Sequence, residues 1–356
     1  MSGFISGSRN SRTGRLTATR LAFSLLACLT IAVVVAMLAP HIGINYDRGG
    51  HYLEFLGLDA YTPGTAAHQV FWIRVPRVLA AMLVGGALAG AGCALQALLR
   101  NPLAEPFTLG ISSGSSLAAV LAIRIGLEGS LGGAGVGAAA LLGAIATLLV
   151  VWRLASIGRQ LPPATLVLAG VTMSMFCSAA SVLIQYTSNF TEISRMIRWM
   201  MGGLDSMQLS AVGYGTIPIV LGLAALIAYA RELNALAAGP EVAASLGVAV
   251  ARTQAVVFIV SSLLVGAAIA LAGPIGFIGL IVPHALRAVI GPDHRVLVPA
   301  SVFGGAVLLM VCDTLARTVT APAQLPTGAV TAVLGGPFFV MILIRQKRHA
   351  AMWGRG

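Results

Sequence analysis

The chain has 356 residues, of which 58% are hydrophobic and only 9% are charged. A soluble globular domain carries about 25% charged residues, so this composition excludes a mainly water-facing surface and indicates a membrane protein. The formal net charge is +11, but the basic residues are spread between apolar segments instead of forming one patch. This distribution argues against nucleic acid as a partner and for the lipid bilayer.

Segments without Asp, Glu, Lys or Arg predict the membrane spans, because about 20 apolar residues cross a bilayer as a helix. Nine such segments follow along the chain: 21–46, 78–99, 106–123, 129–152, 160–191, 206–230, 253–286, 296–312 and 318–344. Gly273 and Pro274 interrupt the seventh, which we divide into a full helix near 252–271 and a shorter helix near 277–290. The expected fold class is an all-α polytopic membrane protein with ten transmembrane helices.

The basic residues also predict the orientation of these spans. With ten spans and a cytoplasmic N-terminus, fifteen Lys and Arg residues face the cytoplasm and seven lie outside or at outer helix ends. This bias obeys the positive-inside rule. We therefore expect a cytoplasmic tail at 1–20, a ten-helix membrane domain at 21–345 and a cytoplasmic tail at 346–356. The apolar run 21–39 is longer than a usual signal-peptide core, so we expect it to be the first span.

Two sequence features bear on metal sites and on symmetry. The four cysteines are scattered through apolar stretches without a CxxC or Cys/His spacing, so no metal site is predicted. The segment LVGGALA at 83–89 resembles LVGAAIA at 264–270, five expected spans later. Such an internal similarity is typical of an inverted-topology repeat, although chance similarity between Gly/Ala-rich helices accounts for it equally well.

Five separated motifs carry a specific resemblance to a known family. They read RVPR at 74–77, QALLRNPLAEP at 96–106 followed by LGISSG at 109–114, GPIGFIGLIVPHALR at 273–287, LPTG at 325–328 and GGPFF at 335–339. Together, over about residues 68–345, they resemble the permease subunits of binding-protein-dependent ABC importers for ferric siderophores, haem and cobalamin. The resemblance implies ten helices per subunit and a homodimer around a central path. This chain departs from the family at Gln324, where a Glu is frequent, and at Ser115, where an Ala is usual.

The resemblance implies a permease that translocates haem or another iron chelate, such as a ferric siderophore, across the inner membrane. A cobalamin permease is the alternative. A proton-coupled secondary transporter is a further alternative, but it requires several intramembrane carboxylates or histidines, and only Asp313 clearly qualifies. We expect Asp313 to pair with Arg317 one helical turn later and not to relay protons.

The chain is not expected to be an enzyme. ATP hydrolysis requires the loop GxxxxGK[ST], and the single lysine, Lys347, lies in no such context. No cofactor is therefore expected on this chain, and ATP and Mg²⁺ are expected on a partner ATPase. The implied partners are a second copy of the chain, two ATP-binding subunits and a periplasmic or extracellular substrate-binding protein.

The connection at about 231–252 is the longest segment expected on the cytoplasmic side. Pro240 and Gly247 are start and stop signals for a short amphipathic helix. By resemblance this helix couples the permease to the ATPase, whereas an ordinary interfacial helix is the simpler alternative. The residues assigned to coupling are Leu236, Gly239, Pro240, Glu241, Ala244, Leu246 and Gly247.

Three arginines on the expected outer side, Arg74, Arg77 and Arg317, are candidates for docking the binding protein. In related permeases, arginines at these places pair with carboxylates on the binding protein, and a guanidinium suits this because it binds carboxylate bidentately. The alternative is that they extend toward lipid headgroups.

The resemblance also implies a cytoplasmic gate and leaves the substrate path open. The gate would comprise Asn101 and Leu103 after the second span and Pro163 and Ala164 at the start of the fifth. The possible path residues are Met196, Arg198 and Met200, since arginines suit haem propionates and soft side chains suit its macrocycle. The simpler alternative for this stretch is an amphipathic helix at the outer interface, anchored by a tryptophan.

Overall fold

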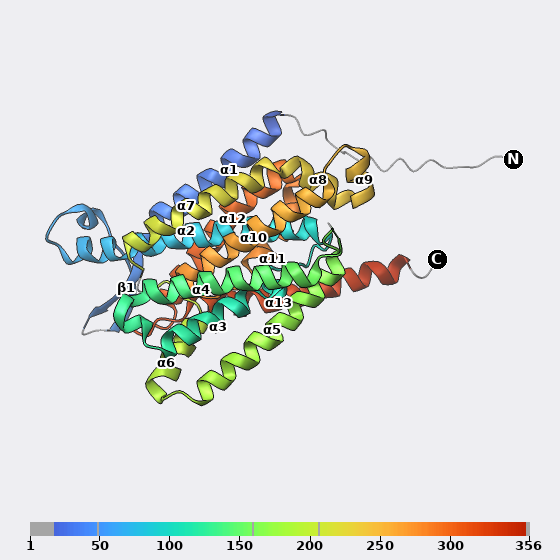
Figure 1. Ribbon diagram of the computed structural model, residues 1–356. Helices are drawn as coiled ribbons and strands as arrows, with labels where there is room; N and C mark the ends of the chain where they lie inside the picture. Colours follow the sequence, from blue (N-terminus) through green and yellow to red (C-terminus); the bar gives the residue numbers. More distant parts are fainter. Residues whose placement is uncertain (1–17, 48–49, 159, 206, 354–356) are drawn as a thin grey trace.

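The structure is a computed structural model in which residues 18–47, 50–158, 160–205 and 207–353 are described, and its helices form an elongated bundle (Figure 1). The elements, with η for a 3-10 helix, are α1 (Ala18–Leu38), η1 (Ala39–His41), β1 (Ile42–Asp47), β2 (Gly50–Phe55), η2 (Leu58–Tyr61), α2 (Ala66–Leu98), η3 (Pro106–Leu109), α3 (Ile111–Arg124), α4 (Leu127–Ala155), α5 (Pro163–Tyr186), α6 (Phe190–Met200), α7 (Leu209–Ala228), α8 (Ala230–Ala238), α9 (Pro240–Ser245), α10 (Val250–Ala272), α11 (Ile278–Ile290), α12 (His294–Thr318) and α13 (Thr327–Trp353).

Eight helices in the described part of the chain are long and apolar enough to cross a membrane: α1, α2, α4, α5, α7, α10, α12 and α13. The helices α3 and α11 are apolar but have only 14 and 13 residues. Each of the ten predicted segments overlaps one of these ten helices, which confirms an all-helical polytopic membrane fold. Because α3 and α11 are shorter than a full span, ten complete crossings stay a prediction.

The division of the seventh apolar segment at Gly273 and Pro274 is confirmed. The helix α10 ends at Ala272, and Gly273 has a φ of 67°, which favours glycine. The chain then takes an irregular course until α11 begins at Ile278.

An antiparallel hairpin, which the apolar segments do not predict, lies outside the membrane helices. Strands β1 and β2 pair from Ile42 opposite Phe55 to Asp47 opposite Gly50. The helix α2 also begins at Ala66, twelve residues before the apolar segment that predicted it at 78. Thr65 caps this early start by accepting a hydrogen bond from the backbone N–H of His68. Charged residues mark where a helix leaves the bilayer and not where the helix ends, which explains the difference.

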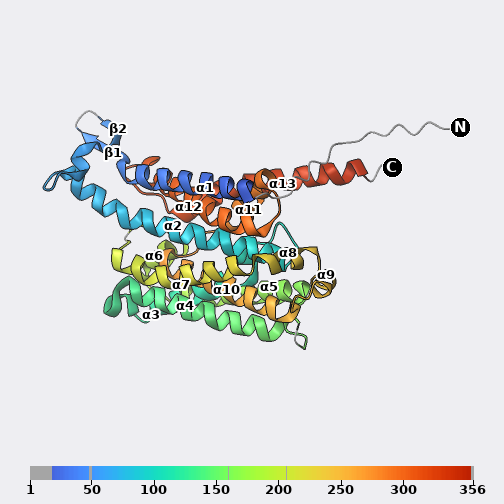
Figure 2. The same ribbon diagram turned by 90° about the horizontal axis from the view of Figure 1, so that it is seen from above.

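The helix α2 lies at the centre of the bundle (Figure 2). Seen from above, α1, α11, α12 and α13 lie on one side of it, and α3 to α7 and α10 lie on the other. Glycines allow neighbouring backbones to touch it: a Cβ on Gly85 would lie 2.3 Å from the carbonyl oxygen of Gly305 in α12. A Cβ on Gly92 would likewise lie 2.2 Å from the carbonyl oxygen of Gly279 in α11. These contacts hold α2 tightly against α11 and α12.

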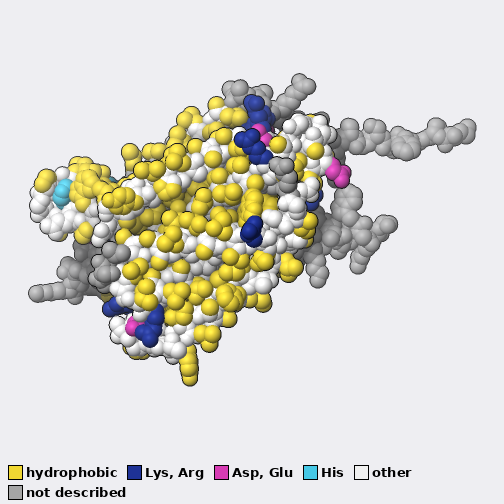
Figure 3. All heavy atoms as spheres, in the orientation of Figure 1, with side chains coloured by type: hydrophobic (Ala, Val, Ile, Leu, Met, Phe, Trp, Pro, Cys, Tyr) yellow, Lys and Arg dark blue, Asp and Glu magenta, His cyan; other side chains and the backbone are white. Residues whose placement is uncertain are grey.

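The outer surface of the bundle is apolar. Hydrophobic side chains cover the face seen in Figure 3, and its few charged side chains lie mostly toward the two ends of the molecule. The helix α1 is largely exposed and apolar, with Phe23, Leu26 and Ile31 among its exposed side chains. A surface of this kind requires lipid as its solvent. The start of α1 and the end of α13 lie at the same end of the bundle as α8 and α9 (Figure 1).

The two short helices begin inside the bundle, each after an irregular segment. Gly279, in the first turn of α11, lies against the backbone of Leu88, ten residues or about 15 Å before the end of α2. The carboxylate of Glu105, just before η3 and α3, accepts a hydrogen bond from the backbone N–H of Phe277. The two irregular segments therefore touch, and their helices are five predicted spans apart. The similar sequence segments 83–89 and 264–270 are also five predicted spans apart, which favours the inverted-repeat interpretation.

Candidate functional site

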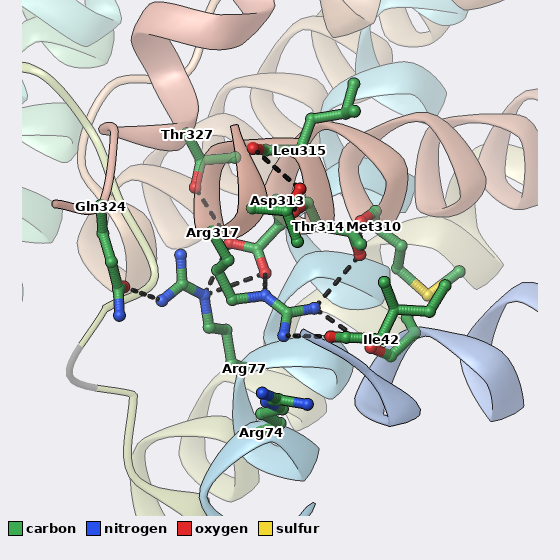
Figure 4. A network of polar contacts seen from close by, with 12 residues as sticks. Ile42, Arg74, Arg77, Met310, Asp313, Thr314, Leu315, Arg317, Gln324 and Thr327 are labelled. Atoms are coloured by element: carbon green, nitrogen blue, oxygen red, sulfur yellow. Dashed lines mark hydrogen bonds and ion pairs between the residues drawn. The ribbon is translucent and has the colours of Figure 1, made fainter. Parts of the chain in front are cut away.

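A buried polar network joins three helices at the end of the bundle that bears the hairpin (Figure 4). Nε of Arg77, on α2, lies 2.7 and 2.9 Å from the two carboxylate oxygens of Asp313, on α12. Asp313 also accepts a 3.0 Å hydrogen bond from the hydroxyl of Thr327, the first residue of α13. Nη1 of Arg77 donates to the amide oxygen of Gln324 at 2.6 Å. Asp313 is only 1% exposed, so the carboxylate depends on these partners for its solvation.

The expected pair between Asp313 and Arg317 is confirmed, with Nε of Arg317 3.3 Å from a carboxylate oxygen. Arg317 extends further and holds the chain after α1, because its two Nη atoms donate to the carbonyl oxygens of Ala39 and Ile42. Arg74 donates in the same way to the carbonyl oxygen of Pro40 at 3.0 Å. The network therefore fixes the junction between α1 and β1 against α2 and α12.

The three arginines expected to dock a binding protein thus have partners within the chain. Arg77 is 5% exposed and Arg317 is 9% exposed, whereas Arg74 is half-buried. Asp205, which lies 3.5 Å from Nη2 of Arg77, is the more exposed member of that ion pair. The docking role stays a prediction, and the geometry adds a structural role for Arg77 and Arg317 that the sequence did not indicate. The pair between Arg77 and Asp313 was missed because 236 positions separate the two residues.

At the opposite end, α8 and α9 form the short helical connection that the sequence predicts. Pro240 is the first residue of α9, Leu246 follows its end, and Gly247 adopts the left-handed conformation with a φ of 81°. The helix and both of its boundaries are therefore confirmed. Gly239, with a φ of 121°, makes the sharp turn between α8 and α9.

The residues assigned to coupling divide between an inner and an outer face. Leu236 is buried and packs with Ala243 and the chain after α9, so it supports the connection from inside. Glu241, Ala244 and Gly247 are exposed. Among the apolar residues, Val242 is 44% exposed and Leu246 is 69% exposed. The residues Glu241, Val242 and Leu246, which we name the α9 face, form the exposed surface that a partner can contact.

A cavity of about 370 Å³ lies between the irregular segments and the ends of α6 and α13. It is lined by Glu105, Phe107, Met200, Met201, Pro274, Gly276, Phe277, Gly328, Ala329 and Ala332. Of the three predicted path residues, Met200 lines this cavity and Arg198 is exposed. Met196 is fully buried against side chains of α3 and α4, so its position is that of a packing residue and it does not line a path in this structure.

The predicted gate residues lie on two separate segments. The side chain of Asn101 accepts a hydrogen bond from the backbone N–H of Leu103, which shapes the turn after α2. Pro163 is the first residue of α5, and Ala164 beside it is exposed. The two segments meet closely further along, where a Cβ on Gly110 would lie 2.7 Å from the carbonyl oxygen of Gly170. A gating role for the four residues stays a prediction.

A model of the FecCD transport family matches residues 25–345, from within α1 to within α13. The chain belongs to the FecCD transport family. Membership makes it a membrane-embedded transport subunit, the permease of an ABC importer. The polar network, the cavity and the α9 face are therefore parts of a FecCD permease.

Curated relatives of this FecCD protein carry names from two substrate classes. The cobalamin import system permease protein BtuC of Halobacterium salinarum is 42% identical over 289 residues, covering 81% of this chain and 76% of that protein. The hemin transport system permease protein HmuU of Yersinia pestis is 40% identical over 298 residues, covering 80% of this chain and 87% of that protein.

A solved structure described as a metal-chelate type ABC transporter in an inward-facing conformation superposes with a TM-score of 0.78. It is 28% identical and covers 91% of this chain and 99% of that one.

Proposed function

We propose that this chain is the permease subunit of an ATP-driven importer that carries haem or another iron chelate across the inner membrane. The observation that carries the proposal is the α9 face, which exposes one carboxylate and two apolar side chains at one end of a bundle otherwise suited to lipid. A partner that covers this face can supply the energy for transport, because the sequence contains no phosphate-binding loop of its own. The relatives named for hemin and metal chelates support the substrate class.

The proposed assembly contains two copies of this chain, two ATP-binding subunits and an external substrate-binding protein. Ten helices cross the membrane in each copy, with both termini on the cytoplasmic side. Support comes from the placement of the start of α1 and the end of α13 at the end that bears α8 and α9 (Figure 1), and from the excess of basic residues expected on that side. The binding protein would dock at the opposite end, near Arg74.

We place the substrate path beside the cavity that Met200 lines. Its walls are mainly apolar, with Phe107, Met201 and Phe277 among them, and Glu105 contributes a carboxylate. Apolar and sulfur-containing side chains suit the flat apolar faces of a chelate macrocycle. Arg198 lies on the same helix as Met200 and offers a cation to an anionic group of the chelate.

A second candidate is cobalamin import, which the relative named for cobalamin import favours at 42% identity. A proton-coupled mechanism has less support, because the carboxylate of Asp313 is held between Arg77 and Arg317 and does not offer a free relay site.

The test is substrate uptake into proteoliposomes that contain this permease and its ATPase, with ATP inside and the binding protein outside. Haem, a ferric siderophore and cobalamin are offered in turn. ATP-dependent accumulation of an iron chelate is the expected result, and accumulation of cobalamin alone would select the second candidate. Uptake that ignores ATP and follows a proton gradient would overturn the proposal.

A further inference from the structure

The side chain of Asn234 links the cytoplasmic connection to the first residues of α12. Its amide nitrogen donates to a carboxylate oxygen of Asp293 at 2.8 Å. Its amide oxygen accepts the backbone N–H of His294 at 2.8 Å and lies 2.8 Å from Nδ1 of the same histidine. The backbone N–H can only donate, so it defines which end of the amide is oxygen, and Nδ1 of His294 must carry a proton to complete the third hydrogen bond.

This linkage is part of the cap of α12. Asp293 is the N-cap residue, and its carboxylate accepts the backbone N–H of Arg295 at 2.9 Å. Nη2 of Arg295 lies 2.6 Å from the other carboxylate oxygen, and the hydrogen bond from this side chain lowers the pKa of Asp293 to about 2. The carboxylate is therefore ionised at neutral pH and accepts from Asn234 throughout the physiological range.

Asn234 also lies on α8, the helix that is joined directly to α9 and would move with it. It is five residues before Gly239, the turn that joins α8 to α9. Leu233, next to it, is fully buried and anchors α8 in the bundle by apolar packing alone. Within the described residues of α8 and α9, the side-chain hydrogen bonds to another helix are those of Asn234. Apolar packing tolerates sliding, whereas three short hydrogen bonds set both distance and direction.

The helix α12 then extends to the other end of the bundle. From His294 to Arg317 it runs 24 residues, or about 35 Å, and it ends in the network around Asp313. At mid-length its Gly305 meets Gly85 of α2 backbone to backbone, so the two helices move together. A displacement applied to the first turn of α12 therefore reaches Arg77, Arg317 and the start of α13.

We propose that Asn234 is a positioning residue that transmits the movement of the α9 face to α12, so that ATP hydrolysis on the partner is converted into a change at the outer network. The inference rests on the proposed ATP-driven function. Without the three hydrogen bonds, α8 and α9 follow the ATPase while α12 stays in place. The predicted defect is therefore a loss of coupling and not a loss of docking.

The test compares variants in the reconstituted importer, by substrate transported per ATP hydrolysed and by the amount of ATPase that co-purifies. Asn234→Ala is expected to lower the transported substrate per ATP at least about fivefold, a typical size for coupling between sites, while ATPase recovery stays at the wild-type level. Asn234→Asp is expected to do the same, because it places a second carboxylate beside Asp293. Ser156→Ala, which removes a hydroxyl that bonds only within the last turn of α4, is the matched control and should match wild type.

A reciprocal exchange separates positioning from general destabilisation. Adding Asp293→Asn to Asn234→Asp restores one amide and one carboxylate to the contact, so the double variant should regain most of the coupling. Adding Asp293→Asn to Asn234→Ala should restore nothing. Wild-type coupling in Asn234→Ala, loss of the co-purifying ATPase in that variant, or failure of the exchange to restore coupling would each overturn the inference. Absence of ATP-dependent uptake by the wild-type importer would instead overturn the proposed function.

Discussion

Nε of Arg77 lies 2.7 Å from the carboxylate of Asp313, although 236 positions separate the two residues in the sequence. The contact joins α2 and α12, the two helices that already touch through Gly85 and Gly305. Both side chains are buried, so the pair depends on good geometry and on the additional donors from Arg317 and Thr327. The network is therefore a structural element of the end that bears the hairpin and not a patch of free surface charge.

Breaking this pair should strongly destabilise the chain. Arg77→Ala leaves the carboxylate of Asp313 with Arg317 as its charged partner, and loss of one member of a buried pair costs about 3–5 kcal/mol. The measurement is the free energy of unfolding in detergent, obtained from a denaturant titration. Gln324→Glu is the matched variant, because it keeps the acceptor for Arg77 and adds a charge; it should not lower the stability. A loss below about 1 kcal/mol for Arg77→Ala, as for an exposed pair, would contradict this assignment.

The α9 face should carry the contact with the ATPase. Leu246→Asp places a charge where 69% of the side chain is now exposed, so it should weaken co-purification of the ATPase about tenfold or more without unfolding the permease. Glu241→Lys, which reverses the charge of the α9 face, should also weaken recovery. Both are measured by pull-down and by stimulation of ATP hydrolysis. Ala237→Asp, on the exposed side of α8, is the control. Unchanged recovery in both α9 variants would count against the assignment.

The close approach of α2 and α12 should tolerate no side chain. In Gly85→Ala the new Cβ would lie 2.3 Å from the carbonyl oxygen of Gly305, so one helix must shift. Overpacking of this kind costs about 1–3 kcal/mol, which should appear as a lower unfolding midpoint in detergent. The matched control is Gly213→Ala in α7, where nothing lies within 4 Å of the new Cβ. That variant should be neutral or stabilising by up to about 1 kcal/mol, and equal losses at the two positions would refute the packing argument.

Docking of the binding protein can be separated from the stability of the network. Replacing Arg74, Arg77 and Arg317 together with Ala should weaken the affinity in a salt-dependent manner, but it also removes buried partners of Asp313. Arg74→Glu alone alters a half-buried side chain whose hydrogen bond is to a backbone carbonyl, so the contacts of Asp313 with Arg77, Arg317 and Thr327 stay intact. We expect about tenfold weaker binding at low salt and an unchanged unfolding midpoint. Wild-type affinity of Arg74→Glu at low salt would exclude a docking role for this arginine.

Much of the fold follows from local properties of the sequence. A span is specified by apolar length, and a helix end by glycine or proline, so the ten helical segments, the break at Gly273 and the limits of α9 could be predicted. The pair Asp313 and Arg317 is one helical turn apart and could be predicted for the same reason. The start of α2 could not, because a helix continues past the membrane wherever a cap such as Thr65 supports it.

The sequence by itself thus determined the membrane class, the approximate helices, the family and the short helical connection before α10. Only the tertiary structure decided which side chains meet. Arg77 turns inward to Asp313, Met196 is enclosed by α3 and α4, and Asn234 reaches the cap of α12. These contacts depend on how the helices are rotated and how closely they pack, and in a chain that is apolar on nearly all sides neither follows from hydrophobic periodicity.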